Sequence, residues 1–233
     1  MTRLSGNQRS QYVQGMFARI AHRYDLMNRL MTAGQDIRWR RDAVRLAGLQ
    51  PGDRLLDIGA GTGDLAREAL RQQPRCQPVA ADFTLEMMRA GRHRRSSAVR
   101  LWASADALHL PFADASFDAV ISGFLLRNVV DLPLALKEQR RVLKPGGRWV
   151  SLDTTPPRRN LTYPLVRFHL SRVIPMLGRL LTGHRDAYTY LPDSTESFLT
   201  AEQLCALLQD ETFREISFRR YMLGAIALHW GRK

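Results

Sequence analysis

The sequence predicts an α/β protein with a Rossmann-like, doubly wound and mostly parallel sheet of seven strands that has helices on both faces. Short β-rich runs alternate with helical segments between about residues 53 and 153. A glycine-rich segment follows the first run, and acidic residues accompany the first three. With 233 residues, of which 45% are hydrophobic, the chain can bury one substantial core, so we expect a single domain over 1–233.

Two amphipathic helices are expected before the core. They are predicted at Val13–Leu30 and Arg38–Leu46, because apolar residues such as Phe17 and Tyr24 fall on one face at helical spacing. We interpret residues 1–50 as N-terminal helices that form a lid over the ligand edge of the sheet.

The predicted cofactor-binding core, residues 51–153, consists of five short apolar strands joined by helical crossovers. The KPGG segment at 144–147 is a strong helix stop followed by a turn. The strands are predicted at Arg54–Ile58, Pro78–Asp82, Arg100–Ala103, Phe117–Ser122 and Arg148–Asp153, and the helices at Asp64–Gln72, Leu85–Arg92 and Leu132–Leu143.

A helical insertion, residues 154–198, is expected before the last two strands. Its main helix, Leu161–Leu181, is interrupted by Pro164 and Pro175. A closing unit at 199–233 follows, with a helix at Ala201–Leu208 and strands at Glu215–Tyr221 and Ala225–Trp230.

The first core strand leads into LDIGAGTGD, which places Gly59, Gly61 and Gly63 between a buried strand and a helix. Glycine has no Cβ, so the main chain can lie close to a flat, charged cofactor. The Gly-x-Gly-x-x-Gly pattern of nicotinamide enzymes requires glycine where this chain has Asp64, and a carboxylate here repels a pyrophosphate. The positive amino-acid part of S-adenosylmethionine, in contrast, is favoured beside Asp57 or Asp64.

Two further aspartates extend this pattern. Asp82 ends the second strand, 23 positions after Gly59, where a carboxylate can bind both ribose hydroxyls. Asp106 follows the third strand and can bind the exocyclic amine of adenine. We therefore predict S-adenosylmethionine as the cofactor. The alternative is an ordinary strand-to-helix turn whose aspartates cap helices.

Charge and residue usage narrow the function further. Lys and Arg number 35 against 22 Asp and Glu, and this net charge of +13 suggests contact with nucleic acid, anionic lipid or acidic metabolites. Cys76 and Cys205 are too far apart in sequence to indicate a zinc site or a disulfide framework. His22, His169 and His229 are too dispersed to predict a metal site. The polar N-terminal segment has no apolar signal region, so we expect a cytoplasmic protein.

The insertion carries an apolar stripe among arginines. Arginine interrupts it too often for a membrane span. The stripe could lie on an anionic membrane at the inner face of the bilayer, or it could belong to the core with the arginines solvated; the sequence leaves both interpretations open. The stripe residues are Leu165, His169, Val173, Met176 and Leu180.

Three groups of motifs carry a family resemblance. The first is FARIAHRYDLMN at 17–28 with WRR at 39–41, the second LPF at 110–112, SFD at 116–118, LRNV at 126–129 and VLKPGG at 142–147, and the third YTYLPDS at 188–194 with GAIALHWG at 224–231. On these segments the chain, from about Met16 to its C-terminus, resembles the ubiquinone/menaquinone biosynthesis C-methyltransferase family.

The resemblance implies an S-adenosylmethionine-dependent enzyme that methylates a ring carbon of a prenylated hydroquinone. Gly123 stands where the family commonly has serine, which leaves only its backbone to contact the cofactor, and Leu125 stands where glycine is usual. Ser197-Phe198-Leu199 replaces a frequent His-Pro. The cofactor-binding residues expected from the glycine segment and the resemblance are Asp57, Gly59, Gly61, Thr62, Gly63, Asp82, Phe83, Asp106, Ala107 and Gly123.

A hydroquinone carbon becomes nucleophilic only when a ring hydroxyl loses or shares its proton. The resemblance implies this role for Arg127 and Asn128, which follow the fourth strand. Arginine stays protonated, so a bound water, Tyr24 or Asp25 is expected to accept the proton. From residue types alone, an Arg127–Asp131 ion pair and a helix cap at Asn128 are the alternative.

Two other functions are weighed against this one. A nucleic-acid methyltransferase would suit the positive charge, but no Asn/Asp-Pro-Pro-Tyr-like motif follows the fourth strand, so we expect no nucleic acid partner. A cofactor-binding protein without turnover would not need Tyr24, Arg127 and Asn128. We favour demethylmenaquinol over a ubiquinone precursor, and the sequence leaves open another small-molecule acceptor, the prenyl length and a homodimer.

Overall fold

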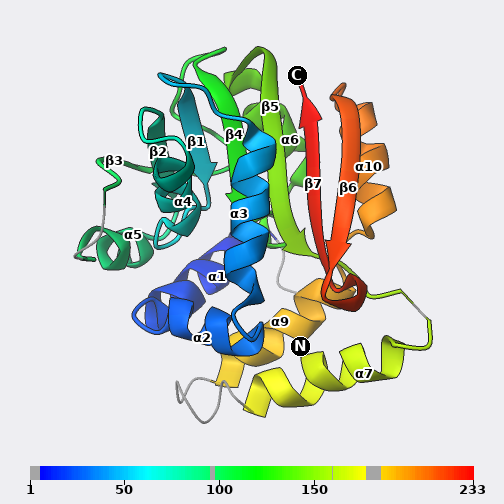
Figure 1. The fold of residues 1–233 in the computed structure, drawn as a ribbon. Coiled ribbons are helices and arrows are strands. Elements are labelled where there is room, and N and C mark those ends of the chain that lie inside the picture. The colour runs from blue at the N-terminus through cyan, green and yellow to red at the C-terminus, as the bar shows by residue number, and fades with distance from the viewer. Residues whose placement is uncertain (1–5, 95–97, 159, 177–184) are drawn as a thin grey trace.

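Seven strands form one sheet in the order β3-β2-β1-β4-β5-β7-β6 (Figure 1). The structure is a computed structural model that describes residues 6–94, 98–158, 160–176 and 185–233. Strands β1 to β5 pair in parallel, and β7 runs antiparallel to β5 and β6. This confirms the predicted doubly wound sheet. The strands are β1 (Arg54–Ile58), β2 (Gln77–Asp82), β3 (Leu101–Ser104), β4 (Phe117–Gly123), β5 (Leu143–Thr154), β6 (Arg214–Tyr221) and β7 (Ile226–Arg232).

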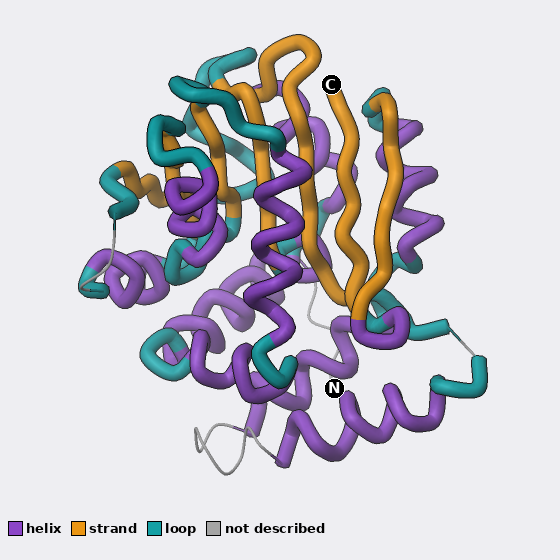
Figure 2. The backbone as a smooth tube through the Cα atoms, viewed as in Figure 1, coloured by secondary structure: helices purple, strands orange, loops and turns teal. Residues whose placement is uncertain are grey.

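Helices cover both faces of the sheet (Figure 2). On one face, Trp39 and Leu65 are buried in a cluster with strand residues, while Leu136 and Leu204 are buried on the other. The helices of the first face are α3 (Gln35–Ala47) and α4 (Asp64–Gln72), those of the second are α6 (Leu132–Val142) and α10 (Ala201–Asp210), and α5 (Leu85–Arg92) joins β2 to β3.

Side-chain caps fix the starts of two of these helices. The Asp131 carboxylate accepts a hydrogen bond of 3.0 Å from the backbone N–H of Leu134 at the start of α6. At the start of α10, Thr200 and Gln203 form a reciprocal capping box. Each cap contributes about 1 kcal/mol, so these polar residues define where the helices begin.

A third group of helices lies beyond the carboxyl ends of the parallel strands, at the bottom of Figure 1. It combines the N-terminal segment with the insertion, and both contribute to one buried cluster. Its members are α1 (Gly6–Ile20), α2 (Tyr24–Met31), α7 (Tyr163–Phe168), the π-helical turn η2 (His169–Val173) and α9 (Arg185–Glu196), and two short 3-10 turns lie nearby, η1 (Leu126–Asn128) and η3 (Met222–Gly224).

The prediction of one helix over Val13–Leu30 is wrong, because the chain turns between α1 and α2. Met16 of α1 and Met27 of α2 are both buried in the same cluster. One straight helix could not fold its two halves onto a common centre, and the turn at 21–23 allows it. We refer to α1 and α2 together as the lid.

The KPGG segment lies inside β5 rather than before it. Leu143 pairs with Phe117 and Arg148 with Ala119, so residues 144–147 bulge out of the parallel ladder. Gly146 has a φ of +73°, which glycine adopts readily. The predicted strand start at Arg148 therefore marks the point where regular pairing resumes.

The insertion buries a different stripe from the predicted one. Val166, Leu170 and Ile174 are buried, whereas Leu165 is 63% exposed and Met176 is 55% exposed. Leu180 lies outside the described residues. The helix therefore packs through residues shifted by one position, and part of the predicted stripe faces solvent.

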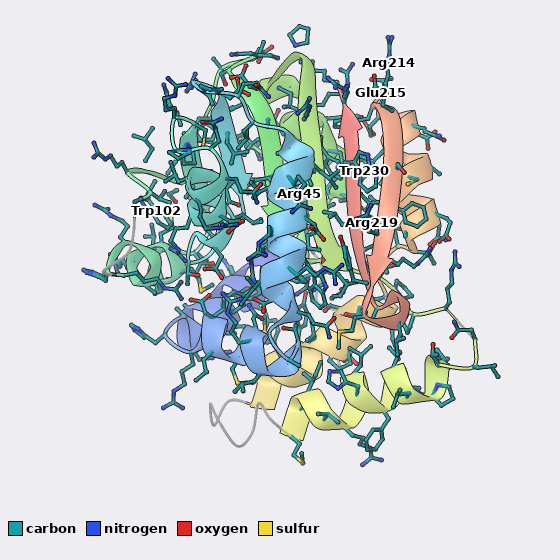
Figure 3. All side chains as sticks on the ribbon, viewed as in Figure 1. Arg45, Trp102, Arg214, Glu215, Arg219 and Trp230 are labelled. Carbon is teal, nitrogen blue, oxygen red and sulfur yellow. The ribbon has the colours of Figure 1, made fainter. Side chains whose placement is uncertain are left out.

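Charged side chains line the edge strand β6. Arg214, Glu215 and Arg219 are exposed (Figure 3), and Glu215 pairs with Arg232 of β7 at 2.8 Å. Charges on an edge strand oppose pairing with the edge of another sheet. The sheet edge formed by β6 is therefore protected against such pairing.

Candidate active site

The glycine loop leaves β1 in a conformation that only glycine fits. Gly59 and Gly63 have φ values of +67° and +84°. A Cβ on Gly59 would lie 2.8 Å from Leu125 Cδ1, and one on Gly63 would lie 2.7 Å from Trp102. Leu125, which departs from the family pattern, thus packs directly on the loop. The loop offers bare backbone to the cleft beside it.

Asp82 connects the end of β2 to this loop. Its Oδ2 accepts a hydrogen bond from the backbone N–H of Gly61, and its Oδ1 accepts one from Thr84, both at 2.7 Å. Burial raises the pKa of Asp82, although these hydrogen bonds oppose the shift. Each oxygen keeps a further lone pair. The carboxylate can therefore shape the loop and still accept hydrogen bonds from a ligand.

Asp57 supports the loop from beneath. Its side chain is fully buried, and its Oδ2 accepts a hydrogen bond of 3.0 Å from the backbone N–H of Ala66 in α4. Oδ1 has no hydrogen-bond partner among the described residues. Burial raises the pKa of Asp57 to about 7. Asp57 does not line the cleft and places a titratable group behind the loop, and its contact with the cofactor stays a prediction.

A cleft of about 830 Å³, including its opening, lies beside the loop. Its residues fit S-adenosylmethionine, because Asp82 and Asp106 offer carboxylates on one side and the bare loop allows close approach. Thr62 and Gly63 do not line the cleft; Thr62 is buried and Gly63 packs against Trp102. The predicted residues that line the cleft are Tyr24, Gly59, Gly61, Asp82, Phe83, Asp106, Ala107, Gly123 and Asn128.

The lid is tied to the loop by polar contacts. Thr62 Oγ1 donates a hydrogen bond of 2.8 Å to Asp25 Oδ1, and Arg94 forms an ion pair with Asp25. Gln14 of α1 donates to the backbone oxygen of Phe83 at 3.0 Å. Asp25 lines neither the cleft nor the neighbouring cavity. Asp25 therefore links the lid to the loop, and its role as a proton acceptor stays a prediction.

A second, apolar cavity of about 810 Å³ adjoins the cleft. Three aromatic residues, Phe17, Tyr24 and Phe124, line both spaces. The rings of Phe17 and Tyr24 meet edge to face, with centroids 5.8 Å apart. We call these three residues the aromatic partition. The rest of this cavity is lined by Met16, Ile20, Met27, Asn28, Met31, Thr32, Arg127, Thr154, Leu170, Ile174, Leu191, Met222, Ala225 and Ile226.

Phe124 is held in an unusual backbone conformation. Its φ is +60°, a region that costs a bulky residue about 1–3 kcal/mol. Its N–H donates to Leu152 O at 2.7 Å, and its oxygen accepts from Asn128 Nδ2 at 2.9 Å. The guanidinium carbons of Arg40 and Arg127 lie 5.9 and 5.4 Å from its ring centroid. Backbone and ring are thus both fixed at the partition.

Residue types alone had suggested an Arg127–Asp131 ion pair and a helix cap at Asn128. The described residues show neither. Arg127 is buried and donates to Asp153 Oδ1 at 2.5 Å, while Asp131 caps α6. Asn128 does not cap a helix; its Oδ1 accepts a hydrogen bond of 3.1 Å from the Tyr190 hydroxyl. Asn128 lines the cleft and Arg127 lines the apolar cavity, so these two adjacent residues border different spaces.

Four residues of this region are absent from the sequence-based site: Asn28, Phe124, Asp153 and Tyr190. Asn28 carried a signal, because it is a polar residue between Met27 and Met31 on a helix that is otherwise apolar on that side. Asp153 also carried one, because it ends the predicted strand Arg148–Asp153, which lies beside the strand that precedes Arg127. The other two depend on contacts that spacing does not reveal.

Comparison with solved structures supports the fold. A possible histamine N-methyltransferase from Thermotoga maritima superposes with a TM-score of 0.65 at 21% identity, covering 94% of this chain and 98% of that one. A phosphoethanolamine N-methyltransferase from Haemonchus contortus with bound S-adenosylmethionine gives 0.60 at 17% identity, covering 81% and 50%. At these identities the likeness shows that the fold is that of S-adenosylmethionine-dependent methyltransferases.

Relatives found by sequence share much higher identity with this chain than these structures do. The chain is 47% identical over 221 residues to the ubiquinone/menaquinone biosynthesis C-methyltransferase UbiE of Desulfotalea psychrophila, covering 95% of this chain and 90% of that protein. It is 43% identical to the demethylmenaquinone methyltransferase of Thermus thermophilus, covering 93% and 99%. The family model described as ubiE/COQ5 methyltransferase matches residues 5–233. This chain therefore belongs to the ubiE/COQ5 methyltransferase family.

Proposed function

We propose that this enzyme transfers the methyl group of S-adenosylmethionine to a ring carbon of demethylmenaquinol, a prenylated hydroquinone. The observation that carries the proposal is the aromatic partition, where a cleft suited to the cofactor meets an apolar cavity beside Arg127. The printed names of the relatives from D. psychrophila and T. thermophilus support a quinone acceptor.

The cofactor would be held by residues at the carboxyl ends of β1 to β4. Asp82 would bind the ribose hydroxyls, Asp106 would bind the adenine amine, and the backbone at Gly59 and Gly123 would contact the remainder. When bound, S-adenosylmethionine supplies an electrophilic methyl group on a sulfonium centre. Aromatic rings attract cations, so the partition is a favourable wall for that centre.

The acceptor ring is activated by Arg127. Asp153 holds the guanidinium in place, and the arginine keeps its charge, so it stabilises the oxygen of a ring hydroxyl as that hydroxyl loses its proton. Tyr24 is the titratable side chain that lines both spaces among the residues described. We assign it the relay of this proton toward water in the cleft. The hydrogen of the methylated ring carbon leaves as the ring becomes aromatic again and the hydroxyl oxygen regains a proton, so one proton is released overall.

Alignment supplies most of the rate in this proposal. The partition would align the acceptor carbon with the methyl group, and the surrounding apolar side chains would exclude water from the ring. The lid supplies Phe17 and Tyr24, so closing it completes the partition.

The outer side of the insertion is proposed to contact an anionic membrane. Leu161, Leu165 and Phe168 are 101%, 63% and 59% exposed, and the exposed Arg167 and Arg172 belong to the same segment. The opposite side of the same helical segment walls the apolar cavity through Leu170 and Ile174. A prenylated substrate would then have a short path from the bilayer. Within the described residues, no helix combines the length and apolar character needed to cross a bilayer.

Mass spectrometry of reaction products tests the proposed function. The purified protein is incubated with S-adenosylmethionine carrying a labelled methyl group and with a panel of reduced quinols: demethylmenaquinol, a demethylated benzoquinol with the same tail, and naphthoquinols without a tail. We expect one labelled methyl on a ring carbon of demethylmenaquinol. Label in the benzoquinol alone would move the assignment to a ubiquinone precursor, and label in no quinol would refute it.

A further inference from the structure

Two residues on the wall of the apolar cavity each carry a buried N–H donor without a hydrogen-bond partner among the described residues. They are Nδ2 of Asn28 and Nε of Arg127, and both residues line the cavity. Buried polar groups are nearly always paired, because an unpaired donor has lost its hydration without compensation. A ligand with two acceptor atoms in this cavity would supply the missing partners of both donors.

We propose that Asn28 is an acceptor-binding residue that, together with Arg127, binds the two oxygens of the hydroquinone ring. This inference rests on the proposed function. A hydroquinone is flat and apolar except for two oxygens, and the cavity is apolar except for a few polar side chains. Each donor meets one oxygen, so the ligand satisfies both donors. An amine or ammonium group would present further N–H groups to them and would fit poorly.

The two donors differ in charge, and this difference assigns the oxygens. Arg127 is cationic and its guanidinium carbon lies 5.4 Å from the ring centroid of Phe124 in the partition. It therefore takes the oxygen that becomes negative as the ring is activated. Asn28 is neutral, so it takes the opposite oxygen, which keeps its proton.

The positions of the donors fix the orientation of the ring. Asn28 follows Tyr24 by one helical turn on α2, so both side chains lie on the same side of this helix. Arg127 enters from the sheet, just after β4. One donor thus comes from the lid and the other from the core, and together they determine which ring carbon reaches the partition.

Thr32 provides a matched control on the same cavity wall. Its hydroxyl donates to Asn28 O at 2.7 Å and lies 3.1 Å from Asp36 Oδ1, so its polar atom is already used. Removing a satisfied hydroxyl weakens the protein, whereas replacing an unpaired amide by an apolar group of similar size does not leave a partner unpaired.

The first measurement is chemical unfolding without an acceptor. We expect Asn28→Leu to be at least as stable as the unmutated protein and Thr32→Val to be less stable. A structural role for the Asn28 side chain would reverse this order, and a marked loss of stability in Asn28→Leu would overturn the proposal.

The second measurement is equilibrium binding of 1,4-naphthalenediol and 1-naphthol to the protein with S-adenosylhomocysteine present, under reducing conditions. In the unmutated protein and in Thr32→Val, we expect the diol to bind about fivefold to tenfold more tightly, the equivalent of one neutral hydrogen bond. In Asn28→Leu this preference should fall to about one, because Arg127 alone serves either ligand.

Each other outcome has a clear meaning. An unchanged preference for the diol in Asn28→Leu would overturn the proposal even if demethylmenaquinol is methylated, and so would a lack of diol preference in the unmutated protein. If the preference depends on Asn28 but no quinol is methylated, the proposed reaction fails and the two-oxygen site stands.

Discussion

The Arg127 guanidinium donates a hydrogen bond of 2.5 Å to the Asp153 carboxylate, and both side chains are buried between the sheet and the apolar cavity. Asp153 compensates the charge of Arg127 and fixes its direction. The backbone N–H of Arg127 also donates to Asp153, at 3.3 Å. The pair therefore holds a permanent positive group beside the acceptor ring without leaving that charge uncompensated.

Replacing Asp153 by Asn should impair both folding and turnover. The change leaves Arg127 charged and buried without a counterion, which costs about 3–5 kcal/mol. Urea unfolding and initial rates at saturating cofactor would measure the two effects. Asp131→Ala is the control: it removes the α6 cap, so about 1 kcal/mol of stability should be lost with turnover retained. Equal turnover losses in both variants would contradict the assigned role of the pair.

Asp82→Ala should weaken cofactor binding by about tenfold to a hundredfold, because hydrogen bonds to a charged acceptor are lost. The loop should also loosen, since Asp82 accepts the Gly61 N–H. Titration calorimetry with S-adenosylhomocysteine would measure the dissociation constant. Asp118→Ala, which removes a carboxylate bonded to the Arg54 N–H at the other end of the sheet, should leave this constant unchanged.

Asp57 should make folding stability depend on pH. Burial raises the pKa of Asp57 from 3.8 to about 7, so between these values the folded protein holds a proton that the unfolded chain has released. Its contribution to stability is therefore complete below about pH 4 and is lost as the pH rises through about 7. Unfolding free energies of the unmutated protein and Asp57→Asn would be compared from pH 4 to 8. The variant should gain relative stability with rising pH, and a constant difference would show that Asp57 does not titrate in this range.

Phe124→Leu should reduce the turnover number about tenfold or more, because small misalignments at the reacting atoms are costly. Affinity for S-adenosylhomocysteine, which lacks the sulfonium charge, should change little, since the leucine retains apolar bulk beside the cleft. Steady-state kinetics and calorimetry would separate the two effects. The control is Phe112→Leu, which also loses an aromatic contact, with Phe117 at 5.1 Å, but lies outside both spaces. Normal turnover in Phe124→Leu would contradict the role of the partition.

The double variant Leu165→Asp, Phe168→Asp should lose binding to anionic liposomes. Both side chains are exposed on the insertion, so the change adds negative charge where apolar contact is proposed. Cosedimentation at low salt would measure the bound fraction. Leu101→Asp is the control, because Leu101 is 53% exposed on β3, at the sheet edge. If the unmutated protein does not bind at low salt, the membrane proposal fails.

The parallel core was predictable because its signals are local. Buried strands are short apolar runs, and Gly59 and Asp82 mark the ends of two of them. Predicted and observed bounds agree closely: Arg54–Ile58 is identical in both, and Pro78–Asp82 differs by one residue. The cofactor cleft followed from the same pattern, since carboxyl ends of parallel strands meet at one edge.

The features that the sequence did not predict depend on contacts between segments that are distant in the chain. No proline or glycine marks the turn at 21–23, which exists because Met16 and Met27 share one buried cluster. The insertion stripe was displaced by one position because several positions of that segment are apolar and only packing selects Val166 over Leu165. The unpaired state of Asn28 Nδ2 is likewise visible only once the cavity around it is known.

The short helix α2 serves both spaces at once. Its first residue, Tyr24, borders the cofactor cleft and the apolar cavity, and Asp25 fastens it to Thr62 in the glycine loop. A ligand that orders this helix from one side therefore lowers the entropic cost of binding the ligand on the other side. By thermodynamic reciprocity, donor and acceptor must raise each other's affinity by the same factor. Release of the demethylated donor should therefore also lower the affinity of the protein for the methylated quinol.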